Sequence, residues 1–158
     1  MNIKMSMIAM VLVSGAAFAN GGGYGGGGGG GGGNPPTMPQ NSSNETVNIY
    51  QQGANNGASV DQSGSKYGVV SIGQNGFNNL ANATQSSAPN SDITVSQVGF
   101  GNTTNALQTG DNSAINVSQN NSFGWGGGNS ATVNQSADNS IVNVSQNGSA
   151  NWANVYQH

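Results

Sequence analysis

Apolar and polar residues alternate along most of the chain from residue 45 onward. The segment 45–62 reads ETVNIYQQGANNGASVDQ, and its alternate positions carry, in two runs, Val47, Ile49, Gln51 and Ala58, Val60, Gln62. A period of two predicts strands with one buried face. The glycine between the runs, Gly53, predicts a tight arc with a positive φ. We therefore expect a strand, an arc and a second strand in this segment.

The same arrangement recurs five times on the template S-x5-Q-x-G-x2-N-x-A-x3-Q, over residues 45–62, 68–85, 91–108, 113–135 and 140–157. Its amides are Gln51, Gln74, Gln97, Gln119 and Gln146; Asn56, Asn79, Asn102, Asn129 and Asn151; and Gln62, Gln85, Gln108, Gln135 and Gln157. Its arc glycines are Gly53, Gly76, Gly99 and Gly148. The fourth copy has Asn121 in place of the glycine and a FGWGGG insertion between its two strands. Such self-similarity predicts a repeat architecture.

The two strands of each copy differ in the size of their alternate residues. The first strand carries a β-branched aliphatic pair, such as Val70 and Ile72, and the second carries mostly small residues, such as Ala81 and Ala83. Large residues facing small ones let two sheets interdigitate. Successive copies are expected to stack as parallel, in-register strands about 4.8 Å apart. The sequence therefore predicts an all-β fold, a five-rung β-solenoid of the cross-β type.

Stacking of the copies places Gln over Gln and Asn over Asn. Each side-chain amide can then donate to its neighbour on one side and accept from its neighbour on the other. An unpaired buried amide would cost roughly 1 to 3 kcal/mol, and a slip by one residue would bury the polar face and break every ladder. The template amides are therefore the candidate residues for the ladder and for polymerisation.

The chain before the first copy has two parts. Residues 1–19 are typical of a secretory signal peptide, with Lys4 in a positive n-region, an apolar run from Ile8 to Val13, and an expected cleavage site after Ala19. Residues 20–44 are rich in glycine and proline and are expected to be disordered, as a linker or as a tail recognised in unfolded form during export. We expect residues 45–158, which contain the five template copies, to form the amyloid (cross-β) core.

Composition excludes several classes of function. Charged residues make up 4% of the chain, the formal net charge is −3, and there is no Cys. Two basic residues are too few for a nucleic-acid site, and scattered acids argue against an enzyme, a small-molecule substrate or a bound cofactor or metal. The four aspartates stand one per copy or turn and are interpreted as gatekeepers against premature aggregation: Asp61, Asp92, Asp111 and Asp138.

Both ends of the predicted stack offer an open strand edge. His158 follows directly after the last template Gln, and the first copy is preceded by glycine and proline. An uncovered rung presents unpaired N–H and C=O groups. We expect the opposite end of a second copy to pair with it, which is a contact that does not close and so produces a filament.

Together, the signal peptide, the Gly-rich segment and the five template copies resemble the curlins, the subunits of bacterial curli fibres. The Gly-rich segment and the uncharged last copy resemble the major rather than the minor, nucleating, subunit. The resemblance implies an extracellular, cell-surface amyloid fibre, a fimbrium that supports adhesion and biofilm matrix. It implies three kinds of partner: further copies of the chain, a nucleator curlin, and the outer-membrane curli secretion channel with its accessory factors.

Other interpretations remain open. The chain could be the minor, nucleating curlin, or a monomeric β-solenoid that acts as an adhesin or an ice-binding protein. A flat repeated Thr face or terminal caps would favour a monomer, and neither is evident in the sequence. A calcium-binding solenoid would need an Asp in every glycine-rich turn, which is absent.

Overall fold

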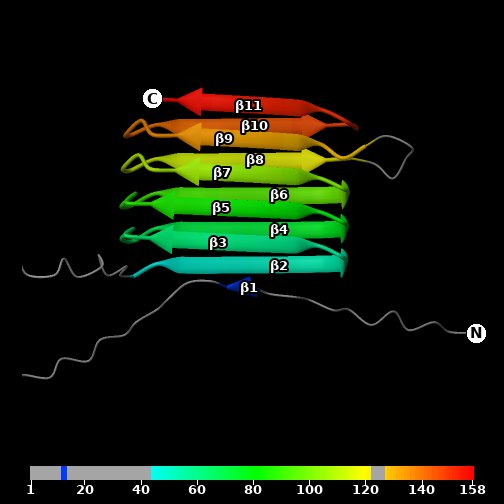
Figure 1. Ribbon diagram of the computed structural model, residues 1–158, viewed down its shortest axis with the longest axis horizontal. Coiled ribbons are helices and arrows are strands. Elements are labelled where there is room, and N and C mark those ends of the chain that lie inside the picture. The colour runs from blue at the N-terminus through cyan, green and yellow to red at the C-terminus, as the bar shows by residue number, and fades with distance from the viewer. Residues whose placement is uncertain (1–11, 14–43, 122–126) are drawn as a thin grey trace, which may run out of the picture.

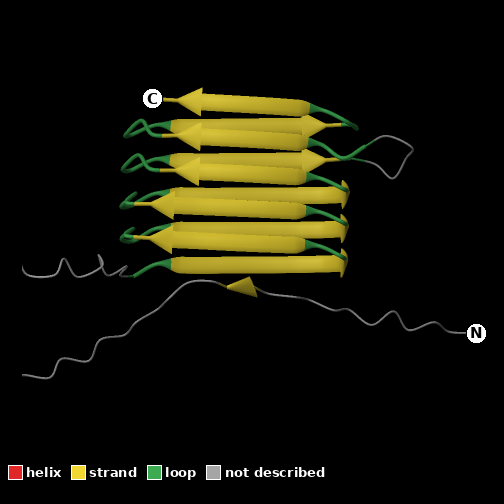
Figure 2. Cartoon of the chain, in the orientation of Figure 1, coloured by secondary structure: helices red, strands yellow, loops and turns green. Residues whose placement is uncertain are grey.

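The structure is a computed structural model that describes residues 12–13, 44–121 and 127–158. Every regular element in these residues is a strand (Figure 2). The strands are β1 (Leu12–Val13), β2 (Thr46–Ala54), β3 (Gly57–Ser63), β4 (Val69–Phe77), β5 (Leu80–Ser86), β6 (Asp92–Phe100), β7 (Thr103–Gln108), β8 (Ala114–Asn120), β9 (Ser130–Gln135), β10 (Ile141–Asn147) and β11 (Trp152–Gln157). The predicted all-β fold is confirmed.

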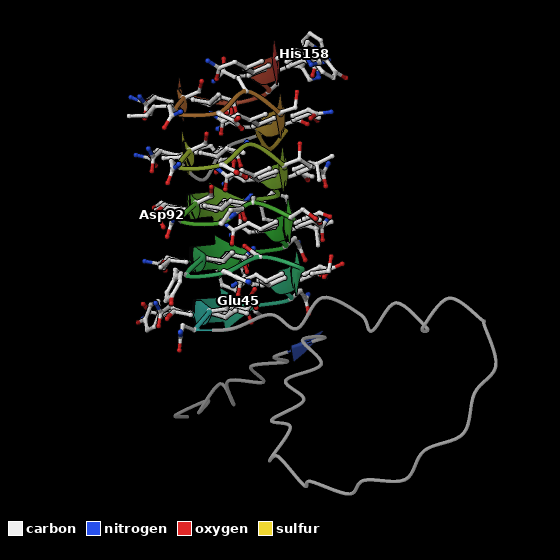
Figure 3. The ribbon with its side chains drawn as sticks, turned by 90° about the vertical axis from the view of Figure 1, so that its left-hand side faces the viewer. Glu45, Asp92 and His158 are labelled. Atoms are coloured by element: carbon white, nitrogen blue, oxygen red, sulfur yellow. The ribbon has the colours of Figure 1, made fainter. Side chains whose placement is uncertain are left out.

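The strands form two parallel sheets that lie against each other (Figure 1). One sheet has the order β10-β8-β6-β4-β2 and the other β1-β3-β5-β7-β9-β11. Each sequence copy contributes one strand to each sheet, and we call this pair a rung: rung 1 is β2 with β3, and rung 5 is β10 with β11. The result is the predicted β-solenoid of five rungs, with Glu45 and His158 at its opposite ends (Figure 3).

Template positions lie side by side in neighbouring rungs. Gln51 pairs with Gln74, and Ala58 pairs with Ala81. The insertion in the fourth copy does not shift this register, since β8 and β10 pair Gln119 with Gln146. Unequal repeat lengths are therefore taken up entirely between strands. Residues 122–126, which include the first four residues of the FGWGGG insertion, lie outside the described part of the chain.

The apolar core is a narrow column between the two sheets. Strands alternate between buried and exposed residues, as in β6 and β10. The sheet that contains β6 supplies larger side chains such as Ile93 and Val95, and the facing sheet supplies smaller ones such as Ala81 and Ala106. At the ends of the column the equivalent residues are only partly buried: Val47, Ile49, Ala153 and Val155. The interior is therefore exposed at both end rungs.

In rungs 1 to 3, the arc between the two strands requires glycine for a steric reason. Gly53, Gly76, Gly99 and Gly148 all have positive φ, between 102° and 133°. A Cβ on Gly53 would collide with the carbonyl oxygen of Gly76 in the next rung, and a Cβ on Gly76 would collide with that of Gly99. Rungs can approach to strand-pairing distance here only without a side chain.

Three of the four turns that connect one rung to the next use asparagine instead. Asn90, Asn112 and Asn139 all adopt the left-handed conformation, with φ of 54°, 51° and 53°. Asparagine tolerates this conformation better than other residues with a Cβ.

In residues 12–13, 44–121 and 127–158 no helix has the length and apolar character to cross a membrane. The expected signal cleavage after Ala19 and almost all of the Gly-rich segment lie outside the described residues.

Candidate functional site

The first template Gln forms a continuous hydrogen-bonded column through all five rungs. Nε2 of each Gln donates to Oε1 of the Gln in the next rung, at 2.6 Å from Gln51 to Gln74, 2.8 Å from Gln74 to Gln97, 2.9 Å from Gln97 to Gln119 and 2.7 Å from Gln119 to Gln146. The direction is the same at every step. The column therefore has a direction: each Nε2 donor points toward rung 5, and each Oε1 acceptor points toward rung 1.

In rungs 2 to 5 the second amide proton of this Gln bonds across to the other sheet. Gln74 Nε2 donates to the carbonyl oxygen of Gly57 at 2.9 Å, and Gln146 Nε2 donates to that of Ser130 at 3.0 Å. Gln97 and Gln119 make the same bond to Leu80 and Thr103. Each amide thus joins its rung to the next and one sheet to the other. Loss of one such buried partner would cost roughly 1 to 3 kcal/mol.

The second template Gln forms an equivalent column at the other side of the core. Its bonds run from Gln62 to Gln85 (2.7 Å), Gln85 to Gln108 (2.9 Å), Gln108 to Gln135 (3.1 Å) and Gln135 to Gln157 (3.2 Å). Gln85 Nε2 also donates across to the Ser91 carbonyl oxygen at 2.6 Å. The apolar core is therefore enclosed between two amide columns that both point toward rung 5.

The template Asn forms a third column with the opposite direction. Asn79 donates both its backbone N–H and its Nδ2 to Oδ1 of Asn56, each at 3.1 Å, and Asn102 does the same to Asn79 at 3.0 Å. Backbone N–H groups of Asn129 and Asn151 continue the column. The structure therefore brings all the template amides together in three stacks.

Buried hydroxyl groups that the sequence did not single out as site residues complete these stacks. In the third rung, where Thr104 replaces the template Ala, its Oγ1 accepts from Gln97 Nε2 at 3.2 Å and donates to Gln119 Oε1 at 2.9 Å. In the second rung, a Cβ on Gly68 would lie 2.9 Å from Ser65 Oγ, so the buried Ser65 hydroxyl lies in the room that the missing side chain leaves. In the sequence, the departures from the template at Gly68 and Thr104 mark these two places, but they do not reveal the hydrogen-bond partners.

The end rungs expose both polar and apolar groups. In rung 1, Gln51 Oε1 is buried and has no hydrogen-bond partner. Within the described residues, no strand pairs with the outer edges of β2, β10 or β11. The four most exposed large hydrophobic side chains whose strands belong to the solenoid also lie in these two rungs: Tyr50, Ile141, Trp152 and Tyr156.

The four aspartates lie at the surface in two settings. Asp61 and Asp92 are exposed on outward positions of β3 and β6, and Asp92 projects from the stack in Figure 3. Asp111 and Asp138 lie in successive turns, where Asp138 Oδ1 accepts the backbone N–H of Asp111 at 2.8 Å. Among the residues described, no three His, Cys, Asp or Glu side chains gather where they could hold a metal ion.

The stacked rungs and amide columns define a repeat β-solenoid whose cohesion comes from hydrogen-bonded amides. The family model of the curlin-associated repeat matches residues 88–120, which include β6, β7 and β8. No curated protein matches the chain. This match supports the resemblance to the curlin family. Curlins are structural amyloid subunits of extracellular curli fibres and not a class of enzymes. The fold and the repeat support a curli-type structural subunit.

Proposed function

We propose that the chain is the major subunit of an extracellular curli fibre and polymerises end to end, in support of adhesion and biofilm matrix. The observation that carries the proposal is the polarity of the first Gln column. Gln51 Oε1 is an unpaired buried acceptor in rung 1. Gln146 Nε2 in rung 5 uses one proton on the Ser130 carbonyl oxygen, and in the inner rungs the equivalent second proton binds the next Gln.

This polarity favours one arrangement of two copies. When rung 5 of one copy meets rung 1 of the next, Gln146 Nε2 can donate to Gln51 Oε1 and continue the column. Two rung-1 ends would bring acceptor to acceptor, and two rung-5 ends would bring donor to donor. Because an unsatisfied buried amide costs roughly 1 to 3 kcal/mol, the head-to-tail joint is favoured. Such a contact does not close, so it propagates into a filament.

The strand edges support the same arrangement. β2 and β10 stand at opposite ends of one sheet, each with an unpaired outer edge among the described residues. In the other sheet, β1 pairs in parallel with the outer edge of β3, joining Val13 to Val60. This edge therefore accepts a parallel strand, as it would accept β11 of a preceding copy. Removal of residues 1–19 as a signal peptide would free it.

The head-to-tail joint can be tested by disulfide cross-linking, because the chain has no Cys. Asn48 and Asn143 occupy the same outward column in rungs 1 and 5, which runs Asn48, Ser71, Thr94, Asn116, Asn143. At the joint their Cα atoms would be about 4.8 Å apart, within disulfide range. Purified protein without residues 1–19 would be prepared as Asn48→Cys and Asn143→Cys, mixed, assembled and oxidised.

We expect amyloid fibres whose disulfide dimers join one Asn48→Cys chain to one Asn143→Cys chain. Asn116→Cys, in the same column but in rung 4, is the matched control and should give no dimer with Asn48→Cys. Dimers of two identical variants would contradict head-to-tail growth. A stable monomer over days, with no thioflavin signal and no cross-β fibre diffraction, would overturn the proposal altogether.

We assign the major rather than the minor role because rung 5 carries no charged side chain within 140–157. A nucleator curlin is then a separate partner that starts assembly at the cell surface. Mass spectrometry of isolated fibres tests this, with this chain expected to make up most of the fibre. A chain present only in traces, whose deletion delays fibre formation by another curlin, would be the nucleator instead.

We further propose that residues 1–19 direct export, that residues 20–44 are recognised by the outer-membrane curli secretion channel and its accessory factors, and that residues 45–158 form the fibre core. The support is compositional. The prolines of residues 20–44 cannot donate ladder hydrogen bonds, and the segment lacks the template amides.

A further inference from the structure

Trp152 is the most exposed large hydrophobic residue of the described chain, at 71%. It lies on the outward face of β11, in rung 5. Its column on this face is Gly57, Leu80, Thr103, Ser130 and Trp152, from rung 1 to rung 5. The largest side chain of the column is thus at one end of the solenoid, and the residue without a side chain is at the other end.

The space at Gly57 is bordered by Leu80. A Cβ on Gly57 would lie 3.2 Å from Leu80 Cδ1, so this methyl group reaches from rung 2 toward the end of the stack. The Leu80 side chain is itself 43% exposed, so the residues of its own copy leave much of its apolar surface open to solvent. The rung-1 end therefore presents a notch whose floor is Gly57 and whose far wall is Leu80.

We propose that the indole of Trp152 occupies this notch in the next copy and packs against Leu80 across Gly57. The partner is a second copy of this chain, and the inference rests on the proposed end-to-end assembly. In a continued register Trp152 adjoins Gly57 of the next copy, and Leu80 lies one rung further, about 9.6 Å away between backbones at two rung spacings. The indole and the leaning leucine span this distance because Gly57 places no side chain between them.

The other sheet shows the same pairing of large with small. Tyr50, on the outward face of β2 in rung 1, is 64% exposed, and its neighbour in rung 2 is Gly73. In the continued register the residue on its other side is Ser145 of the preceding copy, since Ser145 is in the same column. Trp152 and Tyr50 thus each face a small residue at the joint, which gives the joint an apolar contact in addition to its ladder.

Trp152 fluorescence tests the contact. The chain has two Trp residues, so Trp125→Phe leaves Trp152 as the only reporter. On assembly we expect a blue-shifted emission and an about threefold lower quenching constant with acrylamide, since the indole becomes desolvated. Leu80→Ser in this background should remove that protection and raise the critical concentration about tenfold. Leu107→Ser is the control, on the same face but in rung 3.

The outcomes separate the two proposals. Fibres that carry the Asn48 to Asn143 cross-link, but keep Trp152 as accessible as in the monomer, would overturn the Trp152 contact and leave end-to-end assembly standing. Equal critical concentrations for Leu80→Ser and Leu107→Ser would also overturn it. Absence of the cross-link and of fibres would remove the joint and overturn both.

Discussion

The side-chain amide of Asn121 pairs with both backbone groups of Phe100. Its Oδ1 accepts the Phe100 N–H at 2.7 Å, and its Nδ2 donates to the Phe100 carbonyl oxygen at 2.6 Å. A Cβ on Gly99 would collide with this Oδ1, so the glycine makes room for the amide. Asn121 therefore supplies from its side chain the pairing that a strand backbone supplies in the other arcs. The backbone hydrogen bonds of the rung-3 arc are thus satisfied at the point where the insertion begins in rung 4.

Asn121→Ala should expose this edge. Loss of both bonds leaves the Phe100 backbone unpaired at a cost of roughly 1 to 3 kcal/mol. Hydrogen exchange of assembled fibres measures the effect, and the Phe100 amide should exchange about tenfold faster or more. Asn120→Ala, at the neighbouring exposed position, should leave that rate unchanged. Equal rates in the two variants would show that Asn121 does not hold the edge.

Much of the solenoid could be predicted from the alternation of residues, and some of the site could not. The template places Gln51 beside Gln74 whatever the details of the turns, because register follows from a period of two. The direction of the amide columns does not follow from the template, since a Gln amide can point either way. It depends on the backbone carbonyl opposite, such as that of Gly57 for Gln74. The Asn121 amide and the Thr104 hydroxyl likewise act through partners that only the folded chain brings close.

Gln146→Ala tests the last amide of the first column. In the proposed joint this change removes the donor to Gln51 of the next copy, and within its own copy it removes the acceptor for Gln119 Nε2. We expect a longer polymerisation lag and slower elongation from wild-type seeds, by about tenfold for a loss near 1.4 kcal/mol. Thioflavin kinetics measure both. Ser118→Ala is the control, because Ser118 is the exposed neighbour of Gln119 in β8, one rung away from the joint. A Gln146→Ala protein that elongates as fast as this control would argue against ladder continuity at the joint.

The aspartates give a prediction about the rate of assembly. Changing Asp61, Asp92, Asp111 and Asp138 to Asn removes four of the five acidic charges, while the amide of Asp138→Asn retains an oxygen for the bond from the Asp111 N–H. If these charges act as gatekeepers, the lag should shorten severalfold at low salt and differ less at high salt, where charges are screened. Replacing four exposed Ser residues with Asn provides the control for composition. An unchanged lag at low salt would reduce the aspartates to solubilising surface charges.

Deleting residues 20–44 while keeping the signal peptide separates export from assembly. These residues lack the alternating apolar positions of a rung, so purified protein should still form protease-resistant fibres that retain residues 45–158. Cells that express the deletion should show no surface fibres by electron microscopy, because the segment proposed to engage the secretion channel is gone. Recovery of Tyr24 in the resistant core, or normal surface fibres, would assign this segment a different role.

Gly148 offers the sharpest test of fibre polarity. A Cβ on Gly53 would collide with the Gly76 carbonyl oxygen within the same copy, whereas a Cβ on Gly148 would meet only Asn151 Nδ2, at 3.6 Å. In the proposed joint Gly53 of the next copy takes the place above Gly148, and a Cβ there would collide with its carbonyl oxygen. Gly148→Ala has a backbone cost of about 1 to 3 kcal/mol at its positive φ, but within its own copy it meets no such collision.

A Gly148→Ala chain should therefore bind by its intact rung 1 to the rung-5 end of a wild-type fibre. Its own rung 5 should then block the addition of the next chain. We expect substoichiometric amounts to stop growth at that end only, as followed by two-colour fluorescence microscopy on single fibres. Gly53→Ala is the comparison: its collision lies inside each copy, so it should fail to add and should leave wild-type growth unaffected. Growth that continues at both ends in the presence of Gly148→Ala would contradict the stacking of Gly53 over Gly148, because the added methyl group would then not collide with the Gly53 carbonyl oxygen at the joint.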